Sequence, residues 1–362
     1  MSTAIQMNGR PSPGSCPIPI PPGSSASPKV VVTGAAGFIG SHLVDALLAT
    51  GHVVVGVDRR NPCSDLLAGL NLAGAVNHPK FTWVDADVAN ASLDAVLDGA
   101  DCVFHLAGLP GVRRSWGCEF AAYVTANIVA TERLVAACER AGVRRLVYAS
   151  SSSVYGPTTA ASRESDPTRP ISPYGITKLA GELLCLAHAV RADSRLSVVA
   201  LRYFTVYGPR QRPDMAIGRM LAAALTGKRY PLFGNGSQRR EFTYVSDVVN
   251  ATIAASRLEQ RHAVVNVGGG ASVSITDLLG IVGDLTGRPV PLAAVAAQPG
   301  DVCATAADLT NARACLDYRP SVNLPVGLAL HLEWLRGLPA QVLRLYEPMF
   351  EPCAAEVASC TS

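Results

Sequence analysis

Short apolar runs alternate with amphipathic stretches along the first two thirds of the chain. Six runs are rich in β-branched or aromatic residues and have the length of strands; they fall at residues 29–33, 52–58, 81–88, 101–108, 144–151 and 196–204. Stretches with a helical spacing of apolar residues, such as residues 122–142, lie between most of them. Because strands that alternate with helices usually pair in parallel, the pattern predicts an α/β protein with a parallel, doubly wound sheet.

The pattern changes after Tyr203. Residues 208–215 and 231–242 are rich in Gly, Pro and polar residues, which indicates loops, and the helical stretches become interspersed. We therefore expect a first domain over residues 29–202 and a smaller C-terminal α/β domain, mainly for substrate contacts, over residues 203–345. Residues 240–265 are expected to return to the first domain.

Composition limits the classes of function. The first 28 residues are rich in Pro, Ser and Gly and lack the features of a signal peptide, so we expect a disordered tail at 1–28 and a loose one at 346–362. The net charge of +3 gives no footprint for nucleic acid or a membrane surface, and no apolar run has the roughly 18 residues of a membrane span. Ten cysteines without a CxxC pair indicate buried free thiols and a cytoplasmic location, and the seven histidines have no metal-ligand spacing.

Three glycines follow the first predicted strand and open a helix. They form the pattern GxxGxxG at Gly34, Gly37 and Gly40, with Phe38 and Ile39 inside it. Glycines permit a tight turn and a close approach of backbone to a pyrophosphate, which the N-terminus of the helix then faces. The context of strand, turn and helix favours a Rossmann-like dinucleotide site over a simple glycine turn.

Asp58 ends the second predicted strand, 18 residues after Gly40. A carboxylate at this place accepts hydrogen bonds from both ribose hydroxyls and repels a 2′-phosphate, which favours NAD over NADP. Arg59 and Arg60 follow at once and soften that exclusion. Asp87, after the third predicted strand, either reaches the adenine or caps a turn.

A tyrosine and a lysine stand four residues apart at a predicted helix start. Ser172 and Pro173 mark the start, and Tyr174 and Lys178 follow on one face of the helix. The chain has four lysines against 27 arginines, so a lysine here suggests a need for a compact charge. A phenol with a pKa of about 10 needs a shift of about three units, roughly 4 kcal/mol, to act as a base near pH 7. We expect Lys178 and a nicotinamide ring to supply it.

These motifs together resemble the extended short-chain dehydrogenase/reductase family. The matching segments are TGAAGFIG, Asp58, YASSSSVYG (148–156) and YGITK (174–178), and the resemblance extends from about Lys29 to Tyr318. It implies an NAD enzyme in which Tyr174 and Lys178 are catalytic and Lys178 also binds the cofactor. The Ser151 hydroxyl would bond the reacting sugar oxygen, with Ser152 and Ser153 also binding the substrate. It further implies that Asn127 supports the active-site helix, with plain capping as the alternative. Family members pair through helices near 121–140 and 174–192, so a homodimer is expected.

Two serines distinguish the chemistry within this family. Relatives that eliminate water from a nucleotide sugar carry Asp-Glu where this chain has Ser152 and Ser153, so elimination would lack its acid and base. The segments around LRYFTVYGPRQRPDM and QPGDV look like those of UDP-glucuronate 4-epimerases. UDP-galactose 4-epimerases usually have Asn at the place of Thr205, and tend to have Arg at the place of Gln298.

The resemblance assigns three arginines to the substrate. Arg212 would face the C5 carboxylate of the sugar with Thr205 nearby, because a guanidinium matches a planar carboxylate. Arg240 would bind the diphosphate, and Arg113 would touch the cofactor or the sugar. A solvated loop arginine is the alternative for Arg212 and Arg113.

The implied activity is 4-epimerisation of UDP-glucuronate to UDP-galacturonate. Tyr174 takes the proton of the 4-hydroxyl during oxidation at C4, the 4-keto sugar turns, and tightly bound NAD is regenerated when hydride returns to the other face. The alternatives are UDP-glucose/galactose 4-epimerisation and a decarboxylase or dehydratase of the same fold. An NAD-sensing regulator usually lacks the Tyr or the Lys, and an RNA- or protein-binding module lacks support in the charge pattern.

Overall fold

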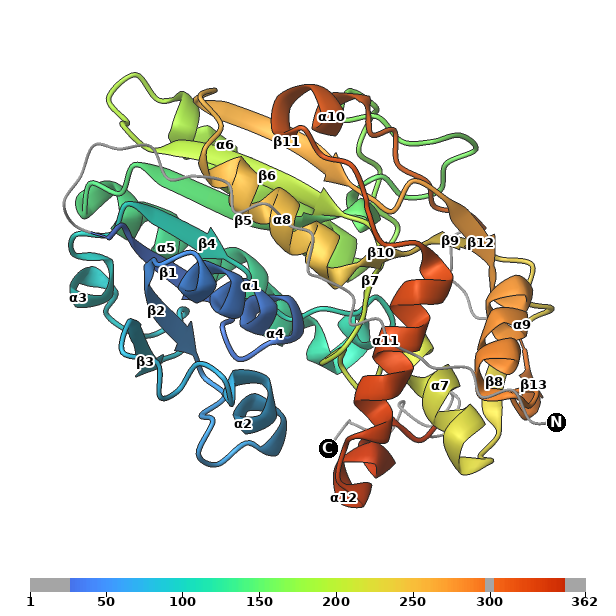
Figure 1. Ribbon diagram of the computed structural model, residues 1–362. Helices are drawn as coiled ribbons and strands as arrows, with labels where there is room; N and C mark the ends of the chain where they lie inside the picture. Colours follow the sequence, from blue (N-terminus) through green and yellow to red (C-terminus); the bar gives the residue numbers. More distant parts are fainter. Residues whose placement is uncertain (1–26, 297–302, 349–362) are drawn as a thin grey trace, which may run out of the picture.

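The computed structural model describes residues 27–296 and 303–348. Its centre is a parallel sheet of seven strands in the order β11-β6-β5-β4-β1-β2-β3 (Figure 1). The strands are β1 (Lys29–Thr33), β2 (Val53–Asp58), β3 (Phe81–Asp85), β4 (Cys102–His105), β5 (Arg145–Ser151), β6 (Ser197–Tyr203) and β11 (His262–Val267). All six predicted strands lie in the sheet, and the doubly wound, Rossmann-like fold is confirmed. The order reverses between β1 and β4, which opens a crevice at their carboxyl ends.

Helices cover both faces of this sheet (Figure 1). Alternate residues of β1 show why: Val30 and Val32 pack into one core and Val31 into the other. The first core is completed by α1 (Phe38–Ala49), α2 (Leu66–Leu72) and α8 (Val245–Ser256). The second is completed by α3 (Asp94–Leu97), α5 (Ala130–Arg140) and α6 (Pro173–Val190), and α4 (Phe120–Val124) packs on α6.

The chain after β6 builds a smaller lobe at the carboxyl side of the sheet. Its helices are α7 (Ala216–Thr226), α9 (Ile275–Thr286), α11 (Leu324–Arg336) and α12 (Ala340–Leu343), whereas α10 (Thr310–Leu316) packs against β11 and α8 of the large lobe (Figure 1). Its short strands pair as β7 (Val206–Tyr207) with β10 (Thr243–Tyr244), β8 (Tyr230–Phe233) with β13 (Leu292–Val295), and β9 (Arg239–Glu241) with β12 (Ser272–Ser274). Between β10 and β12 the chain returns to the large lobe as α8 and β11. Figure 1 shows α11 between the sheet and the pair α7 and α9.

Several expectations fall on the ends of the chain. Residues 1–26, 297–302 and 349–362 lie outside the described residues, and with them Gln298 and most of both expected tails. Tyr346, which we expected at the start of the loose tail, is instead buried, and its hydroxyl donates to the Gln211 carbonyl at 2.6 Å. The folded chain therefore runs past the expected boundary, because this phenol packs into the core.

The described part of the chain bears on three further expectations. Its seven cysteines are free thiols, of which Cys102, Cys138 and Cys185 are buried, whereas Cys63, Cys118 and Cys303 are exposed. The expectation of buried thiols is thus right for only some of them. Among residues 27–296 and 303–348, no helix has the length and apolar character to cross a membrane, and no cluster of His, Cys, Asp and Glu is arranged to hold a metal ion.

Candidate active site

The turn after β1 is shaped by glycine. Gly34 has φ +71°, and a Cβ placed on it would lie 2.7 Å from the Ala107 nitrogen. A Cβ on Gly40 would clash with the Gly34 carbonyl oxygen. α1 begins at Phe38 after Gly37, whose lack of a side chain leaves the first-turn N–H groups uncapped. The turn is therefore a cradle into which side chains do not fit, and it suits the pyrophosphate of a dinucleotide.

The carboxylate of Asp58 lies beside this cradle at the end of β2. It accepts hydrogen bonds from the backbone nitrogens of Ala36 (3.1 Å) and Arg60 (3.0 Å), and burial raises its pKa. The Arg60 guanidinium is held by both oxygens of Asp65 at 2.9 Å each. Because two nitrogens of the Arg60 guanidinium already bind Asp65, Arg60 is less able to attract a 2′-phosphate than the sequence suggested. The preference of the site for NAD over NADP is strengthened accordingly.

Asp87 caps a turn, one of the two roles that the sequence left open, and its contact with an adenine stays a prediction. One carboxylate oxygen accepts from the Ala89 nitrogen at 2.9 Å and so caps a turn. The other lies 3.8 Å from the Arg59 guanidinium, and the residue lines the same cavity as Asp58.

A cavity of about 570 Å³ extends from the glycine turn to α6 and the loop after β7. It brings together ten of the residues predicted from the sequence, namely Gly34, Gly37, Phe38, Ile39, Gly40, Asp58, Asp87, Tyr174, Lys178 and Arg212. The other predicted residues are not part of its lining: Ser151, Ser152, Ser153, Thr205, Arg113 and Arg240. Tyr346 and Asp214 line it without having been predicted.

Tyr174 is fixed by the first turn of α6. The hydroxyl of Ser172 caps the helix by accepting from the Gly175 nitrogen at 3.1 Å, and Pro173 occupies the first turn. Burial raises the pKa of Tyr174, while a hydrogen bond with the Ser151 side chain and the charge of Arg212 oppose the rise. Among the side chains, the opposing charge comes from Arg212, which the sequence did not assign to this task. That Lys178 and a nicotinamide ring together lower the pKa of Tyr174 stays a prediction.

Lys178 lies one turn further along α6 and is only 7% exposed. Its Nζ is 4.4 Å from the centre of the Tyr148 ring, a cation–π contact. Burial lowers the pKa of Lys178 to about 8, and the charges of Cys185 and Glu182 oppose this shift. The ammonium therefore exchanges its proton far more readily than an exposed lysine does.

Glu182 continues the same face of α6 as a buried anion. Both oxygens contact the Arg202 guanidinium, at 2.6 and 3.1 Å, and one also accepts from the Ser150 hydroxyl at 2.5 Å. Removal of one partner from such a pair leaves a buried charge uncompensated, so the pair fixes α6 against β5 and β6. Sequence reasoning missed it, although Glu182 continues the four-residue spacing of Tyr174 and Lys178.

Asn127 joins three elements of the site. It lies in a π-helical turn (Thr125–Val129) and accepts from the Leu109 nitrogen at 2.7 Å. Its amide donates to the Leu109 carbonyl and to the Thr177 hydroxyl, each at 3.0 Å. The side chain thus ties the loop after β4 to α6, which agrees with the support that the resemblance implied.

Arg212 meets an unpredicted partner in its own loop. Its Nε and Nη2 contact the two carboxylate oxygens of Asp214, each at 3.0 Å. The loop is anchored to α1 and to β7, since Arg210 pairs with Asp45 of α1 at 2.7 Å and the side-chain amide of the buried Gln211 donates to the Val206 carbonyl of β7. The signal in the sequence was the Arg-Pro-Asp triplet, but its pairing depends on the loop conformation.

The remaining predicted residues lie around this centre. The Ser151 hydroxyl accepts from the Ser153 nitrogen at 3.2 Å and caps a short helix (Ser152–Val154). The Thr205 carbonyl accepts from the Thr243 nitrogen at 2.9 Å. The Arg113 guanidinium stacks 4.1 Å above the Phe233 ring, and Arg240 donates to the Arg239 carbonyl at 2.9 Å. The structure thus brings Ser151 to Tyr174 and leaves both of these arginines outside the cavity lining.

Comparison with known proteins agrees with this geometry. The model of the NAD-dependent epimerase/dehydratase family matches residues 30–268. An uncharacterized UDP-glucose epimerase, YtcB of Bacillus subtilis strain 168, is 40% identical over 315 residues, which cover 86% of this chain and 98% of that protein. The chain therefore belongs to the NAD-dependent epimerase/dehydratase family of enzymes, and the cradle and Asp58 fit its cofactor, NAD.

Two solved proteins are similar in structure. MoeE5 in complex with UDP-glucuronic acid and NAD is 46% identical, with a TM-score of 0.79, and the match covers 85% of this chain and 99% of that one. The same protein has also been solved with UDP-glucose and NAD. The UDP-glucuronic acid 4-epimerase of Bacillus cereus, in complex with UDP-glucuronic acid and NAD, is 39% identical with a TM-score of 0.81, and covers 85% and 99% of the two chains.

Proposed function

We propose that this enzyme interconverts UDP-glucuronate and UDP-galacturonate by epimerisation at C4. The observation that carries the proposal is the place of Arg212, whose charge acts on the Tyr174 phenol within one cavity. In a uronate the carboxylate at C5 is adjacent to the reacting C4. A guanidinium that lines the same cavity as the phenol is therefore suited to bind that carboxylate while the phenol serves C4.

Each side chain has a separate task in the reaction. Tyr174 accepts the proton of the 4-hydroxyl, and the Ser151 hydroxyl stabilises the charge that develops on the 4-oxygen. Lys178 contributes positive charge to the same wall of the cavity. When bound, NAD supplies the reversible oxidation at C4, and it is tightly held and regenerated in each cycle.

Arg212 has a second task during the keto stage. A 4-ketone next to a C5 carboxylate is a β-keto acid, which loses CO2 most easily when the carboxylate bond stands perpendicular to the carbonyl plane. A guanidinium that holds the carboxylate in another orientation opposes this loss. The absence of a carboxyl group at Ser152 and Ser153 also leaves that loop without an acid and base for elimination.

The residues outside the cavity lining have proposed roles toward the rest of the substrate. Arg240 binds the diphosphate, Arg113 contacts the cofactor or the sugar, and Thr205 lies near the carboxylate. In support, Arg240 lies on β9 and Arg113 stacks on β8, two strands of the smaller lobe.

UDP-glucose 4-epimerisation is the second candidate, and one observation favours it. The charge of Arg212 is already matched by Asp214, so a neutral sugar would not leave a bare guanidinium. MoeE5, similar to this chain, has been solved with either UDP-sugar.

The test is to incubate the purified enzyme separately with UDP-glucuronate and with UDP-glucose and to read the C4 configuration by NMR. We expect UDP-galacturonate from the first as the faster reaction, with no pentose. Turnover of UDP-glucose alone would favour the second candidate, and a pentose product would indicate a decarboxylase.

We further propose a homodimer formed through α6 and its neighbour. Ile176, Leu183 and Val190 are exposed at intervals of seven residues on α6, and Phe120 and Val129 are exposed on the adjacent segment. This spacing repeats every two helical turns, as in helix bundles. Light scattering should give twice the chain mass for the wild type and the single mass for Leu183→Glu.

A further inference from the structure

We propose that Asp214 determines how the enzyme discriminates acidic from neutral sugars, as an internal counter-ion of Arg212 that a substrate carboxylate must displace. The proposal rests on the proposed role of Arg212 in binding the C5 carboxylate. In this inference Asp214 weakens the binding of an acidic sugar and allows the binding of a neutral one.

The contact between Arg212 and Asp214 has the geometry expected for a contact between Arg212 and a substrate carboxylate. Nε and Nη2 of Arg212 meet the two oxygens of Asp214 at 3.0 Å each, which is the bidentate arrangement that a uronate would adopt. Both residues line the cavity. Two carboxylates cannot use the same edge of one guanidinium, and like charges placed there repel one another.

The pair is also weak enough to be exchanged. The side chain of Arg212 is 31% exposed and that of Asp214 is 45% exposed, so water screens their attraction. A sugar carboxylate that arrives with a bound nucleotide competes at high effective concentration. The exchange therefore needs no large energy input.

The surrounding loop stays in place when the pair opens. Arg210 is bound to Asp45, and the Gln211 side chain bonds the Val206 carbonyl and the Gly218 nitrogen, each at 3.0 Å. Tyr346 adds a hydrogen bond to the Gln211 carbonyl. Displacement of Asp214 is thus a side-chain rotation, not a loop opening, and Arg212 remains beside the cavity.

The consequence for specificity has two parts. With UDP-glucuronate, Asp214 competes for the guanidinium and weakens binding. With UDP-glucose, whose C5 group is uncharged, Asp214 keeps the guanidinium paired, so the sugar does not bind beside an unmatched charge. Asp214 therefore narrows the difference in affinity between the two sugars.

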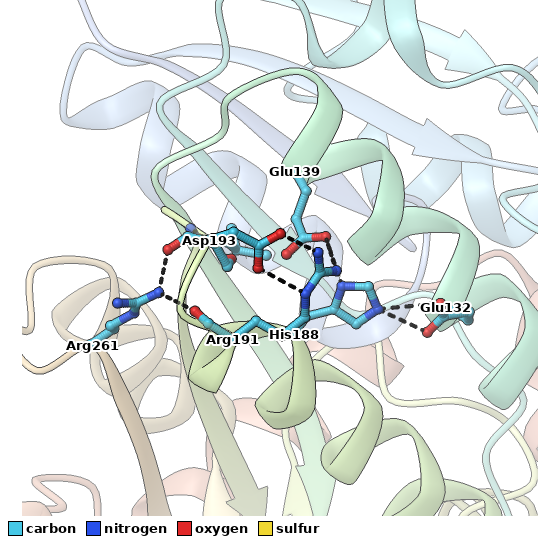
Figure 2. A network of polar contacts seen from close by, with 8 residues as sticks. Glu132, Glu139, His188, Arg191, Asp193 and Arg261 are labelled. Atoms are coloured by element: carbon cyan, nitrogen blue, oxygen red, sulfur yellow. Dashed lines mark hydrogen bonds and ion pairs between the residues drawn. The ribbon is translucent and has the colours of Figure 1, made fainter.

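The chain contains a matched control pair. Arg191 and Asp193 have the same spacing and the same two-point contact, at 3.1 and 2.7 Å, at the far end of α6 (Figure 2). They are not part of the cavity lining. Asp193→Asn thus removes a two-point contact of the same geometry without touching the site, and Arg191 keeps its second contact with Glu139 at 3.3 Å.

The experiment measures dissociation constants of UDP-glucuronate and UDP-glucose by calorimetry on the NAD-loaded enzyme. For Asp214→Asn we expect the preference for UDP-glucuronate to rise about three- to five-fold, the upper part of the range for such an ion pair. Asp214→Glu, which keeps the charge, and Asp193→Asn should both keep the wild-type preference. When Arg212 is already replaced by Ala, the additional substitution Asp214→Asn should leave the preference between the two sugars unchanged.

Other outcomes would overturn the proposal. Weaker binding of UDP-glucuronate by Asp214→Asn would mean that Asp214 only orients Arg212, and an unchanged preference would mean that it has no part in specificity. If the enzyme epimerises UDP-glucuronate and gives either of these results, the inference about Asp214 is wrong and the proposed function is unaffected. If the wild type acts on UDP-glucose alone and Asp214→Asn gains affinity for UDP-glucuronate, the proposed function is wrong and the inference stands.

Discussion

The two ends of α6 carry polar groups under opposite conditions. At the N-terminal end, Tyr174 and Lys178 are desolvated in the cavity wall, and Lys178 rests on an aromatic ring. At the C-terminal end, His188 contacts the carboxylates of Glu132 (3.2 Å) and Glu139 (2.9 Å). Figure 2 shows the second group as a closed network that also includes Arg191, Asp193 and Arg261.

This difference indicates which end of α6 serves catalysis and which end serves stability. In the network at the C-terminal end, the carboxylates of Glu132 and Glu139 contact His188, Arg191 contacts Glu139 and Asp193, and these contacts join α5 to α6. At the N-terminal end, burial shifts the pKa values of a phenol and an ammonium in opposite directions. Groups with shifted pKa values in a cleft are those prepared for proton transfer.

The largest effect is expected at the N-terminal end. Tyr174→Phe removes the proposed base, so kcat should fall by about 10²- to 10⁴-fold, the usual contribution of general acid–base catalysis. Thermal unfolding should stay close to that of the wild type, since the ring still packs against Tyr123. A kcat within a few-fold of the wild type would show that another group takes the proton.

Lys178 should make stability depend on pH. Burial lowers its pKa to about 8 in the folded protein, against 10.5 when solvated. Below pH 8 the folded state therefore carries a desolvated ammonium, which destabilises it. Between about pH 8 and 10.5 the unfolded chain binds more protons, and the free energy of unfolding should therefore rise with pH, by up to about 3 kcal/mol. Urea unfolding of the wild type and of Lys178→Met across this range measures it. The same rise in Lys178→Met would assign it to another group.

Arg212→Ala should affect the substrate more than the fold. Loss of a charge-assisted bidentate contact should weaken UDP-glucuronate binding about ten-fold or more. Because the keto intermediate is then no longer held, we also expect some release of a 4-keto-pentose, detected by mass spectrometry. Unchanged affinity together with clean epimerisation would exclude the proposed role.

The smallest effect is expected at the C-terminal end. His188→Ala removes the contacts with Glu132 and Glu139, and the free energy of unfolding should fall by about 1 kcal/mol, with kcat unchanged. Chemical denaturation and the epimerase assay measure the two quantities. A large loss of kcat would show that the two ends of α6 are coupled.

The sequence predicted the parts of this protein that depend on local order. A β-branched run before GxxGxxG specifies strand, turn and helix, and the spacing of Tyr174 and Lys178 specifies a shared helix face, so both appear in the structure as expected. The charge that opposes the rise in the Tyr174 pKa was not predicted, because Arg212 is brought to the phenol by the fold and not by helix spacing.

The missed features depend on distant or conformational contacts. Tyr346 reaches the site from 135 residues beyond Gln211, which periodicity does not reveal. Asp214 is near Arg212 in the chain, but their pairing depends on the loop shape set by Arg210 at φ +64°. The ion pair of Glu182 with Arg202 joins α6 to β6, and only the packing of this helix on the sheet brings the two together.

The central claim is that oxidation at C4 is reversed within one binding event. It is tested most directly with UDP-glucuronate that carries deuterium at C4, incubated with the enzyme and analysed by NMR and mass spectrometry. The account predicts UDP-galacturonate that retains the deuterium at C4, with none of this product from Tyr174→Phe. Loss of the label to solvent, or a neutral pentose as the main product, would contradict it.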